Sequence, residues 1–146
     1  MSYSCRTCNS GASFAAWATQ TKATLKEKQE QTPTDCPPDV IALGNSSWTL
    51  LHSIAATYPK IPTRSQQSDL AAFVRLFAKL YPCWTCAEDF QAYLEKEAPK
   101  VGSRRDFGWW LCEAHNDVNR KLGKPVFDCR LWEERWRTGW KDGRCD

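Results

Sequence analysis

Two cysteines separated by two residues stand where a helix is expected to begin. Cys83-Trp84-Thr85-Cys86 follows Pro82, which we expect at the first helical position, so that Cys83 lies in the first turn. The backbone N–H groups of a first turn are unpaired, and the helix dipole places partial positive charge on them. A thiolate there is stabilised and its pKa falls, which favours disulfide exchange. We therefore interpret the pair as redox-active.

Two structural readings of the motif stay open. The pair could form a purely structural disulfide, or it could supply half of a zinc site. Zinc would need a second cysteine or histidine pair at short spacing, whereas the other CxxC motif, Cys5-Arg6-Thr7-Cys8, is separated from it by most of the chain. A thioredoxin-type protein would need βαβ units, and the chain has no strand pattern of useful length. Electrons from the pair must therefore leave by another route.

A group of inward-facing polar residues suggests that route. His115 and Asn119 lie one helical turn apart beside an apolar stripe, and His52 faces inward on an earlier helix. Together with Asn116 and nearby tryptophans, they suit a flat heteroaromatic ring with a hydrogen-bonding edge. Lys121 and Lys124 follow at the same helix end, where they could face a diphosphate. The alternative is satisfied core histidines and asparagines with solvated lysines.

Apolar residues recur at helical spacing through most of the chain, which predicts an all-α protein: a four-helix bundle with a short extra C-terminal helix. The residues that recur at helical spacing are, in chain order, Trp48, Leu51, His52 and Ala55; Leu70, Phe73, Val74, Phe77, Leu80 and Tyr81; Phe90, Tyr93 and Leu94; Phe107, Trp110, Leu111, Ala114, His115, Val118 and Leu122, which face inward; and Trp132, Trp136 and Trp140 at four-residue spacing.

Residue types at their ends set the expected bounds of these helices. The first is expected to be capped by Asn45, Ser46 or Ser47 and to end before Pro59. The second should stop at Pro82, where the third begins, and the third should run to about residue 97. The fourth should span residues 104–122 and end at Gly123, and the fifth about 130–140.

The N-terminal part of the chain has a different composition. Leu25 is the only large aliphatic residue between residues 9 and 35, so this segment can bury too little apolar surface to offset the entropy of ordering. We expect residues 1–35 to be a flexible arm carrying Cys5 and Cys8, and residues 36–146 to be the folded domain.

Composition narrows the class of protein. A net charge of +3 gives no reason to propose nucleic acid or an acidic membrane as a partner. No apolar run approaches the roughly 20 residues of a membrane span, and residues 1–13 lack the apolar core of a secretory leader, so neither is expected. Eight cysteines suggest disulfides and an oxidising compartment, and eight tryptophans suit a core or the walls of an aromatic pocket.

Several motifs together resemble the Erv/ALR family of FAD-linked sulfhydryl oxidases. The resemblance covers about residues 35–146. The matching stretches include Asp35-Cys36-Pro37-Pro38-Asp39, Tyr81-Pro82-Cys83 with Cys86-Ala87-Glu88-Asp89, Trp110-Leu111-Cys112, His115-Asn116, Val118-Asn119-Arg120-Lys121-Leu122-Gly123-Lys124-Pro125 and Phe127-Asp128-Cys129.

The resemblance implies a role for each cysteine pair. Cys83–Cys86 would be the redox disulfide beside the flavin, with Cys86 nearest the ring and Cys83 exposed to exchange. Cys112–Cys129 would be a structural bridge, and Cys36 and Cys145 would pair between subunits of a head-to-tail homodimer. Cys5–Cys8 would be the shuttle disulfide. The implied FAD contacts are Gly44, Ser47, Trp48, His52, Tyr81, His115, Asn116, Val118, Asn119, Lys121, Lys124 and Trp136, and no metal is implied.

The implied activity is FAD-dependent thiol oxidation. Electrons would pass from client thiols through Cys5–Cys8 and Cys83–Cys86 to FAD, and then to oxygen, giving hydrogen peroxide, or to cytochrome c. The implied location is the mitochondrial intermembrane space, with its CPC-type import oxidoreductase as client, and the endoplasmic reticulum is the alternative. A flavin-free thiol–disulfide carrier and a disulfide-stapled extracellular binding factor are the alternative functions.

Overall fold

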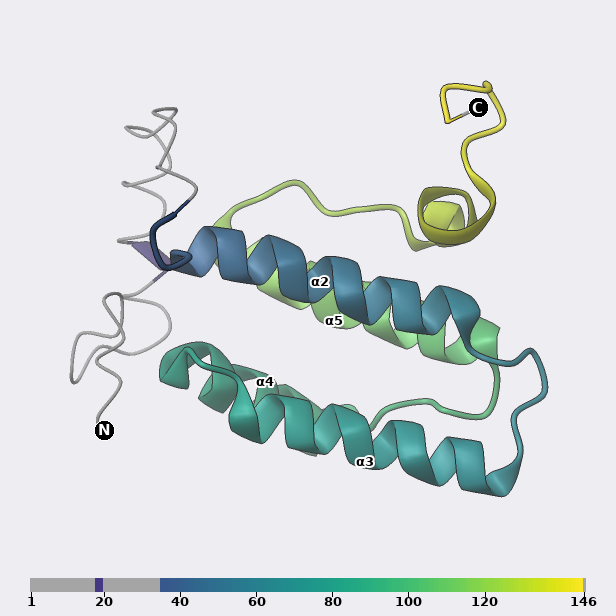
Figure 1. Cartoon of the computed structure of the whole chain (residues 1–146), viewed down its shortest axis with the longest axis horizontal. Coiled ribbons are helices and arrows are strands. Elements are labelled where there is room, and N and C mark those ends of the chain that lie inside the picture. Colours follow the sequence, from purple (N-terminus) through teal and green to yellow (C-terminus); the bar gives the residue numbers. More distant parts are fainter. Residues whose placement is uncertain (1–17, 20–34, 146) are drawn as a thin grey trace.

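The computed structural model describes residues 18–19 and 35–145, and over that part the prediction of an all-α bundle is confirmed. Its four long helices are α2 (Val40–Thr57), α3 (Arg64–Leu80), α4 (Trp84–Lys96) and α5 (Arg104–Leu122). Successive helices run in opposite directions, α2 packing along α5 and α3 along α4 (Figure 1). The start of α2, the end of α3, the start of α4 and the end of α5 therefore meet at one end of the bundle.

The first helix begins earlier than expected. Asp39, not a residue between 45 and 47, is the N-cap of α2, and its carboxylate accepts from the backbone N–H groups of Ile41 at 3.0 Å and Ala42 at 2.8 Å. The core stripe that locates the helix in the sequence starts only at Trp48. The preceding turns face a pocket instead of the core, so they add no inward stripe.

The turn between α3 and α4 also differs in detail from the prediction. α3 begins with a capping box between Thr63 and Gln66 and ends at Leu80, which is 77% exposed and so lies off the buried stripe. α4 begins at Trp84, with Cys83 as its N-cap, so Pro82 precedes the helix instead of opening it. Cys86, the third helical residue, is the cysteine in the first turn.

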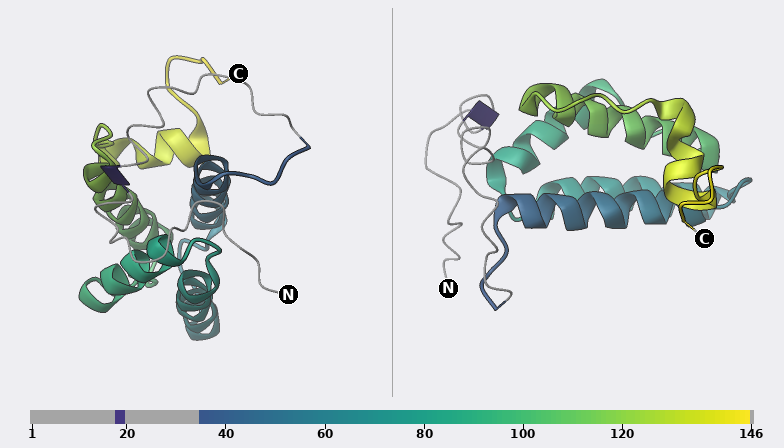
Figure 2. Two further views of the ribbon diagram at one scale, coloured as in Figure 1. Left: turned by 90° about the vertical axis from the view of Figure 1, so that its left-hand side faces the viewer. Right: turned by 90° about the horizontal axis from the view of Figure 1, so that it is seen from above.

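The C-terminal segment folds back over the bundle. Gly123 ends α5 with a left-handed φ of 66°, as its position predicts. The chain then returns to lie across α2, as two views show (Figures 1 and 2). The single helix expected over 130–140 is instead a 3₁₀ turn, Cys129–Leu131, followed by a π-helix, Glu134–Thr138. Trp132 and Trp136 still face inward, but Trp140 lies beyond the π-helix, with the Arg144 guanidinium over its ring.

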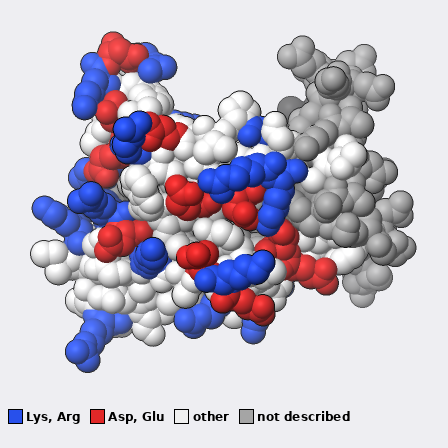
Figure 3. Space-filling view, turned by 180° about the vertical axis from the view of Figure 1, so that it is seen from behind, with Lys and Arg blue, Asp and Glu red and all other residues white. Residues whose placement is uncertain are grey.

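The surface of the described domain carries charges of both signs. Lysines and arginines alternate with acidic residues on the face turned away in Figure 1, with no broad area of one sign (Figure 3). None of the helices within residues 18–19 and 35–145 is long and apolar enough to cross a membrane. The same residues contain no cluster of three or more potential metal ligands.

Candidate active site

A pocket opens at the end of the bundle where α2 and α4 begin and α5 ends. The space within the pocket and over its open mouth amounts to about 950 Å³. Its walls are mostly apolar and aromatic, with a few polar groups among them. The lining residues are Val40, Ile41, Gly44, Asn45, Ser47, Trp48, Leu51, Phe77, Tyr81, Cys86, Asp89, Phe90, His115, Val118, Asn119, Leu122 and Lys124.

The redox motif lies at the edge of this pocket. Cys83 and Cys86 form a disulfide with their Cα atoms 5.3 Å apart. Cys86, in the first turn of α4, lines the pocket, whereas Cys83 lies outside it. A thiolate on Cys86 would face the unpaired N–H groups and positive dipole end of that turn. The two sulfurs of the motif therefore differ in position: one faces the pocket and the other lies behind it.

Cys83 is not exposed, contrary to the sequence-based expectation. It is only 1% exposed and packs with Ala18, itself 2% exposed, in a small cluster with Tyr81 and Cys86. The hydroxyl of buried Thr85 lies 3.5 Å from the Cys83 sulfur. Ala18 belongs to the segment that was expected to be a free arm, and it packs against Cys83. Cys83 is the cysteine that was expected to be exposed for exchange with a second thiol.

Aromatic rings stack along one wall of the pocket. The indole of Trp48 lies parallel to the imidazole of His115, with ring centres 4.0 Å apart and planes at 4°. Behind it, His52 is stacked on Trp136 at 4.4 Å. His52 bonds to His115 through Nε2···Nδ1 at 3.0 Å and accepts from Nε1 of Trp132 at 3.0 Å. The pocket wall is thus supported by a second layer of aromatic residues from the C-terminal segment.

Both histidines are held neutral. Burial, followed by the charges of His115 and Arg135, lowers the pKa of His52 to about 3. Burial, followed by the charges of Lys124 and Arg135, lowers the pKa of His115 to about 4. The wall can therefore offer hydrogen bonds near neutral pH without adding positive charge.

Eight of the twelve expected FAD contacts line the pocket, and four do not. Those in the lining are Gly44, Ser47, Trp48, Tyr81, His115, Val118, Asn119 and Lys124. His52 and Trp136 lie in the layer behind His115, so they act on the pocket through its ring. Asn116 and Lys121 are engaged with other parts of the protein.

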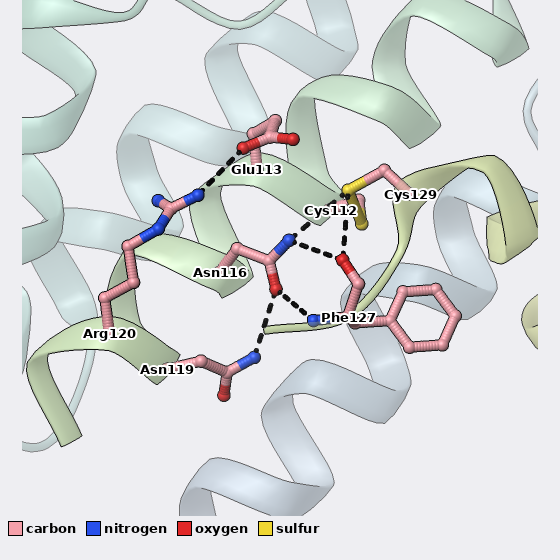
Figure 4. A network of polar contacts seen from close by, with 7 residues as sticks. All are labelled: Cys112, Glu113, Asn116, Asn119, Arg120, Phe127 and Cys129. Carbon is pink, nitrogen blue, oxygen red and sulfur yellow. Dashed lines mark hydrogen bonds and ion pairs between the residues drawn. A yellow bond between two sulfur atoms is a disulfide. The ribbon is translucent and has the colours of Figure 1, made fainter. Parts of the chain in front are cut away.

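The side chain of Asn116 faces the chain that follows α5 (Figure 4). It is 1% exposed, donates to the carbonyl of Phe127 at 2.8 Å and accepts from the N–H of Phe127 at 2.9 Å. Asn119 donates to the Asn116 carbonyl at 3.3 Å while lining the pocket. Asn116 thus fixes the returning segment against α5 beside the Cys112–Cys129 disulfide.

Lys121 and Lys124, like Asn116 and Asn119, differ in whether they contact the protein or line the pocket. Lys121 donates to both carboxylate oxygens of Asp89, at 2.8 and 2.9 Å, and also pairs with Asp117. Lys124 lines the pocket, and no ion pair found among the described residues includes it. Lys124 is therefore the cation available to a charged ligand, and Lys121 ties α5 to α4.

The remaining cysteines fall into three groups. Cys112 and Cys129 are bonded, with Cα atoms 5.8 Å apart, which places the bridge where the resemblance implies it. Cys36 and Cys145 are free and exposed in the single chain, so their pairing between subunits stays a prediction. Cys5 and Cys8 lie outside the described residues.

Sequence reasoning missed two kinds of site residue. Val40, Ile41 and Asn45 line the pocket from turns of α2 that were expected to precede the helix or only to cap it. Trp132 was noted for its four-residue spacing from Trp136, but its hydrogen bond to His52 had no signal in the sequence. Asp39 at the start of an apolar run was the available clue to the early start of α2.

The pocket has features that suit a flavin nucleotide. A Cβ added at Gly44 would meet no atom within 4 Å, so the helix leaves space on its pocket side. The stacked wall suits a flat ring system, Asn119 and His115 offer polar atoms, and Lys124 offers a cation. A disulfide sulfur in the same wall adds a redox partner.

Comparisons with known proteins agree with these features. Residues 45–137 match the Erv1 / Alr family. The mitochondrial FAD-linked sulfhydryl oxidase ERV1 of Saccharomyces cerevisiae is 55% identical over 106 residues, which are 73% of this chain and 56% of the yeast protein. Mitochondrial FAD-linked sulfhydryl oxidase erv1 of Schizosaccharomyces pombe is 41% identical over 154 residues, covering 90% of this chain and 85% of that protein. The chain thus spans only part of the length of the relatives it matches.

Solved structures show the same similarity. The crystal structure of the yeast Erv1 core superimposes with a TM-score of 0.73 at 50% identity, covering 79% of this chain and 98% of the other. The FAD-binding domain of Erv1 from Saccharomyces cerevisiae gives a TM-score of 0.70 at 53% identity, covering 72% of this chain and all of that one.

Proposed function

Because this chain belongs to the Erv1 / Alr family, we propose that it is an FAD-dependent sulfhydryl oxidase that makes disulfides in client proteins. The observation that carries the proposal is the position of Cys86, which is bonded to Cys83 and lines a pocket suited to a flavin. A disulfide with one sulfur in a cofactor pocket can pass electrons inward while its other sulfur exchanges with thiols.

The residues that would hold FAD are those of the pocket lining. Trp48 and His115 form the flat wall, Gly44 leaves room beside α2, and Lys124 provides positive charge for the diphosphate. His52 and Trp136 support that wall from behind. The chemistry that bound FAD supplies is acceptance of two electrons from a dithiol and their transfer to oxygen, giving hydrogen peroxide, or to cytochrome c.

The protein's own steps are thiol–disulfide exchange. An incoming thiolate attacks the Cys83 sulfur, the Cys83–Cys86 bond breaks, and Cys86 is released as a thiolate. The first turn of α4 stabilises that anion, which makes Cys86 a good leaving group. Because Cys83 is buried under Ala18, this contact has to open before the attacking thiol can reach it.

Further parts of the proposal concern partners and location. Cys5–Cys8 would act as the shuttle between client and Cys83, and Cys36 and Cys145 would link two chains in a homodimer. Two relatives are named mitochondrial, which supports a mitochondrial location. The intermembrane space, with its CPC-type import oxidoreductase as client, is the compartment we propose.

Oxygen uptake driven by dithiothreitol tests the function. An oxidase should purify as a yellow protein with bound FAD and should consume oxygen without an added acceptor. A flavin-free carrier would exchange disulfides but would be colourless and consume no oxygen. An extracellular binding factor would show neither property, so a colourless folded protein refutes the proposal.

A further inference from the structure

A chain of three hydrogen-bonding rings runs from the C-terminal segment to the pocket. The Trp132 indole, 4% exposed, donates from Nε1 to Nδ1 of His52 at 3.0 Å. Nε2 of His52 lies 3.0 Å from Nδ1 of His115, whose ring lines the pocket. The first two rings are outside the lining, so they act on a ligand only through the third.

The donor and acceptor capacities of the three rings determine which ring nitrogen of each carries a hydrogen. An indole nitrogen can only donate, so Nδ1 of His52 must accept and carries no hydrogen. A neutral imidazole has one N–H, so that of His52 is on Nε2 and donates to Nδ1 of His115. His115, also neutral, must then carry its hydrogen on Nε2.

The neutrality on which this depends has a physical basis. Burial is the largest cause of the lowered pKa of both rings, and the charge of Arg135 on the π-helix lowers the pKa of both further. The charge of Lys124 after α5 also lowers the pKa of His115, and His115 lowers that of His52. No carboxylate contributes to stabilising a charged form of either ring. Each ring therefore carries a single hydrogen at neutral pH.

We propose that Trp132 is a positioning residue that, through His52, fixes the tautomer of His115 so that the pocket is presented with an Nε2–H donor. This deepens the proposed function, because the group met by that donor would be a hydrogen-bond acceptor of the flavin nucleotide. No hydrogen bond from Nε2 of His115 to the described residues is found, and stacking on Trp48 fixes the plane of the ring. A ligand edge that offers only donors would be rejected.

The Trp132 indole packs against α5 at Gly108, where the helix has no side chain. A Cβ added at Gly108 would lie 2.7 Å from two atoms of the Trp132 ring. The ring therefore contacts the helix backbone closely, and Gly108→Ala would displace the donor from His52 without introducing an atom into the pocket lining. Gly102→Ala is the matched control, because its added Cβ would meet only the Asp106 carboxylate, at 3.9 Å.

Long-range ¹H–¹⁵N spectra of the full chain test the assignment directly, because the chain has only two histidines. With FAD bound, both should show a protonated Nε2 and an unprotonated Nδ1 at pH 7. A hydrogen on Nδ1 of His115, or a charged ring, would overturn the proposal. A protein without bound FAD would contradict the proposed function instead, and the tautomers could still be measured in it.

Two variants test the role of the donor. Trp132→Phe removes the N–H, so His52 should populate both tautomers, His115 should follow, and FAD affinity should fall by about tenfold, as for one lost hydrogen bond. Gly108→Ala should change the spectra in the same direction, and Gly102→Ala should leave them unchanged. If Trp132→Phe does not fold, Gly108→Ala decides. Unchanged tautomers in the folded variants, with FAD affinity within about twofold, would refute a positioning role.

Discussion

Asn116 and Asn119 lie one turn apart on α5, but Asn116 bonds to the Phe127 backbone whereas Asn119 lines the pocket. Replacing each by alanine should therefore have different effects. Asn116→Ala removes two partly buried hydrogen bonds to the backbone of Phe127, of 2.8 and 2.9 Å. It also leaves the N–H and C=O of Phe127 without those partners. Asn119→Ala removes one bond of 3.3 Å from a residue that lines the pocket.

The magnitudes follow from burial. Two net hydrogen bonds of about 1 kcal/mol each, plus a reduced penalty for the partly buried Phe127 groups left without partners, give a loss of about 3 kcal/mol for Asn116→Ala. Asn119→Ala should lose less than about 1 kcal/mol of stability, but it should bind FAD several-fold more weakly because Asn119 lines the pocket.

Urea denaturation followed by far-UV circular dichroism measures the free energy of unfolding, in protein stripped of FAD and again with excess FAD. The Asn116→Ala loss should be present without FAD, since it is structural. Wild-type stability of FAD-stripped Asn116→Ala, together with a fall in its FAD affinity, would contradict a structural role. That pattern would mean that Asn116 acts on the ligand, as the sequence resemblance implied.

Three further predictions concern the pocket, the bridge and the histidines. Gly44→Ala should stabilise α2 by up to about 1 kcal/mol in FAD-free urea denaturation, yet weaken FAD binding in a titration, because its methyl group enters open pocket space. Replacing Cys112 and Cys129 together by alanine should cost about 3 kcal/mol in the same denaturation assay, the loop entropy expected for a sequence separation of 17. Because the folded-state pKa values of His52 and His115 are lowered to about 3 and 4, their contribution to stability is fully present above pH 6.5 and is lost as pH falls towards those values. At pH 5.5, unfolding should therefore take up close to two protons, about one at each histidine. The pH dependence of the unfolding free energy measures this uptake, and the histidine part of its slope should disappear when both residues are replaced by glutamine.

Much of the bundle could be predicted because its helices bury one stripe each. α3 and α5 have long apolar stripes and clear terminal residues, Pro82 and Gly123, and the C-terminal ends of both were located within a few residues. The first turns of α2 were missed because Val40 and Ile41 face a pocket, and a pocket wall has no inward stripe. The tryptophan spacing of the C-terminal segment indicated a helix but could not distinguish an α-helix from 3₁₀ and π turns.

The site was harder to predict than the fold. Helical spacing places Asn116 and Asn119 on neighbouring faces, but it cannot say that one meets the Phe127 backbone and the other the pocket. Those roles depend on where the segment after Gly123 returns. The burial of Cys83 under Ala18 depends in the same way on a contact between segments distant in sequence, which residue types alone do not specify.

In the mechanism that we propose, Cys86 passes electrons to a flavin in the pocket it lines. Anaerobic mixing with dithiothreitol, followed by the visible absorption of bound FAD, tests it most directly. The wild-type protein should lose its yellow colour rapidly, whereas Cys86→Ser should retain the same amount of FAD and stay yellow. Bleaching of Cys86→Ser at the wild-type rate would contradict the account.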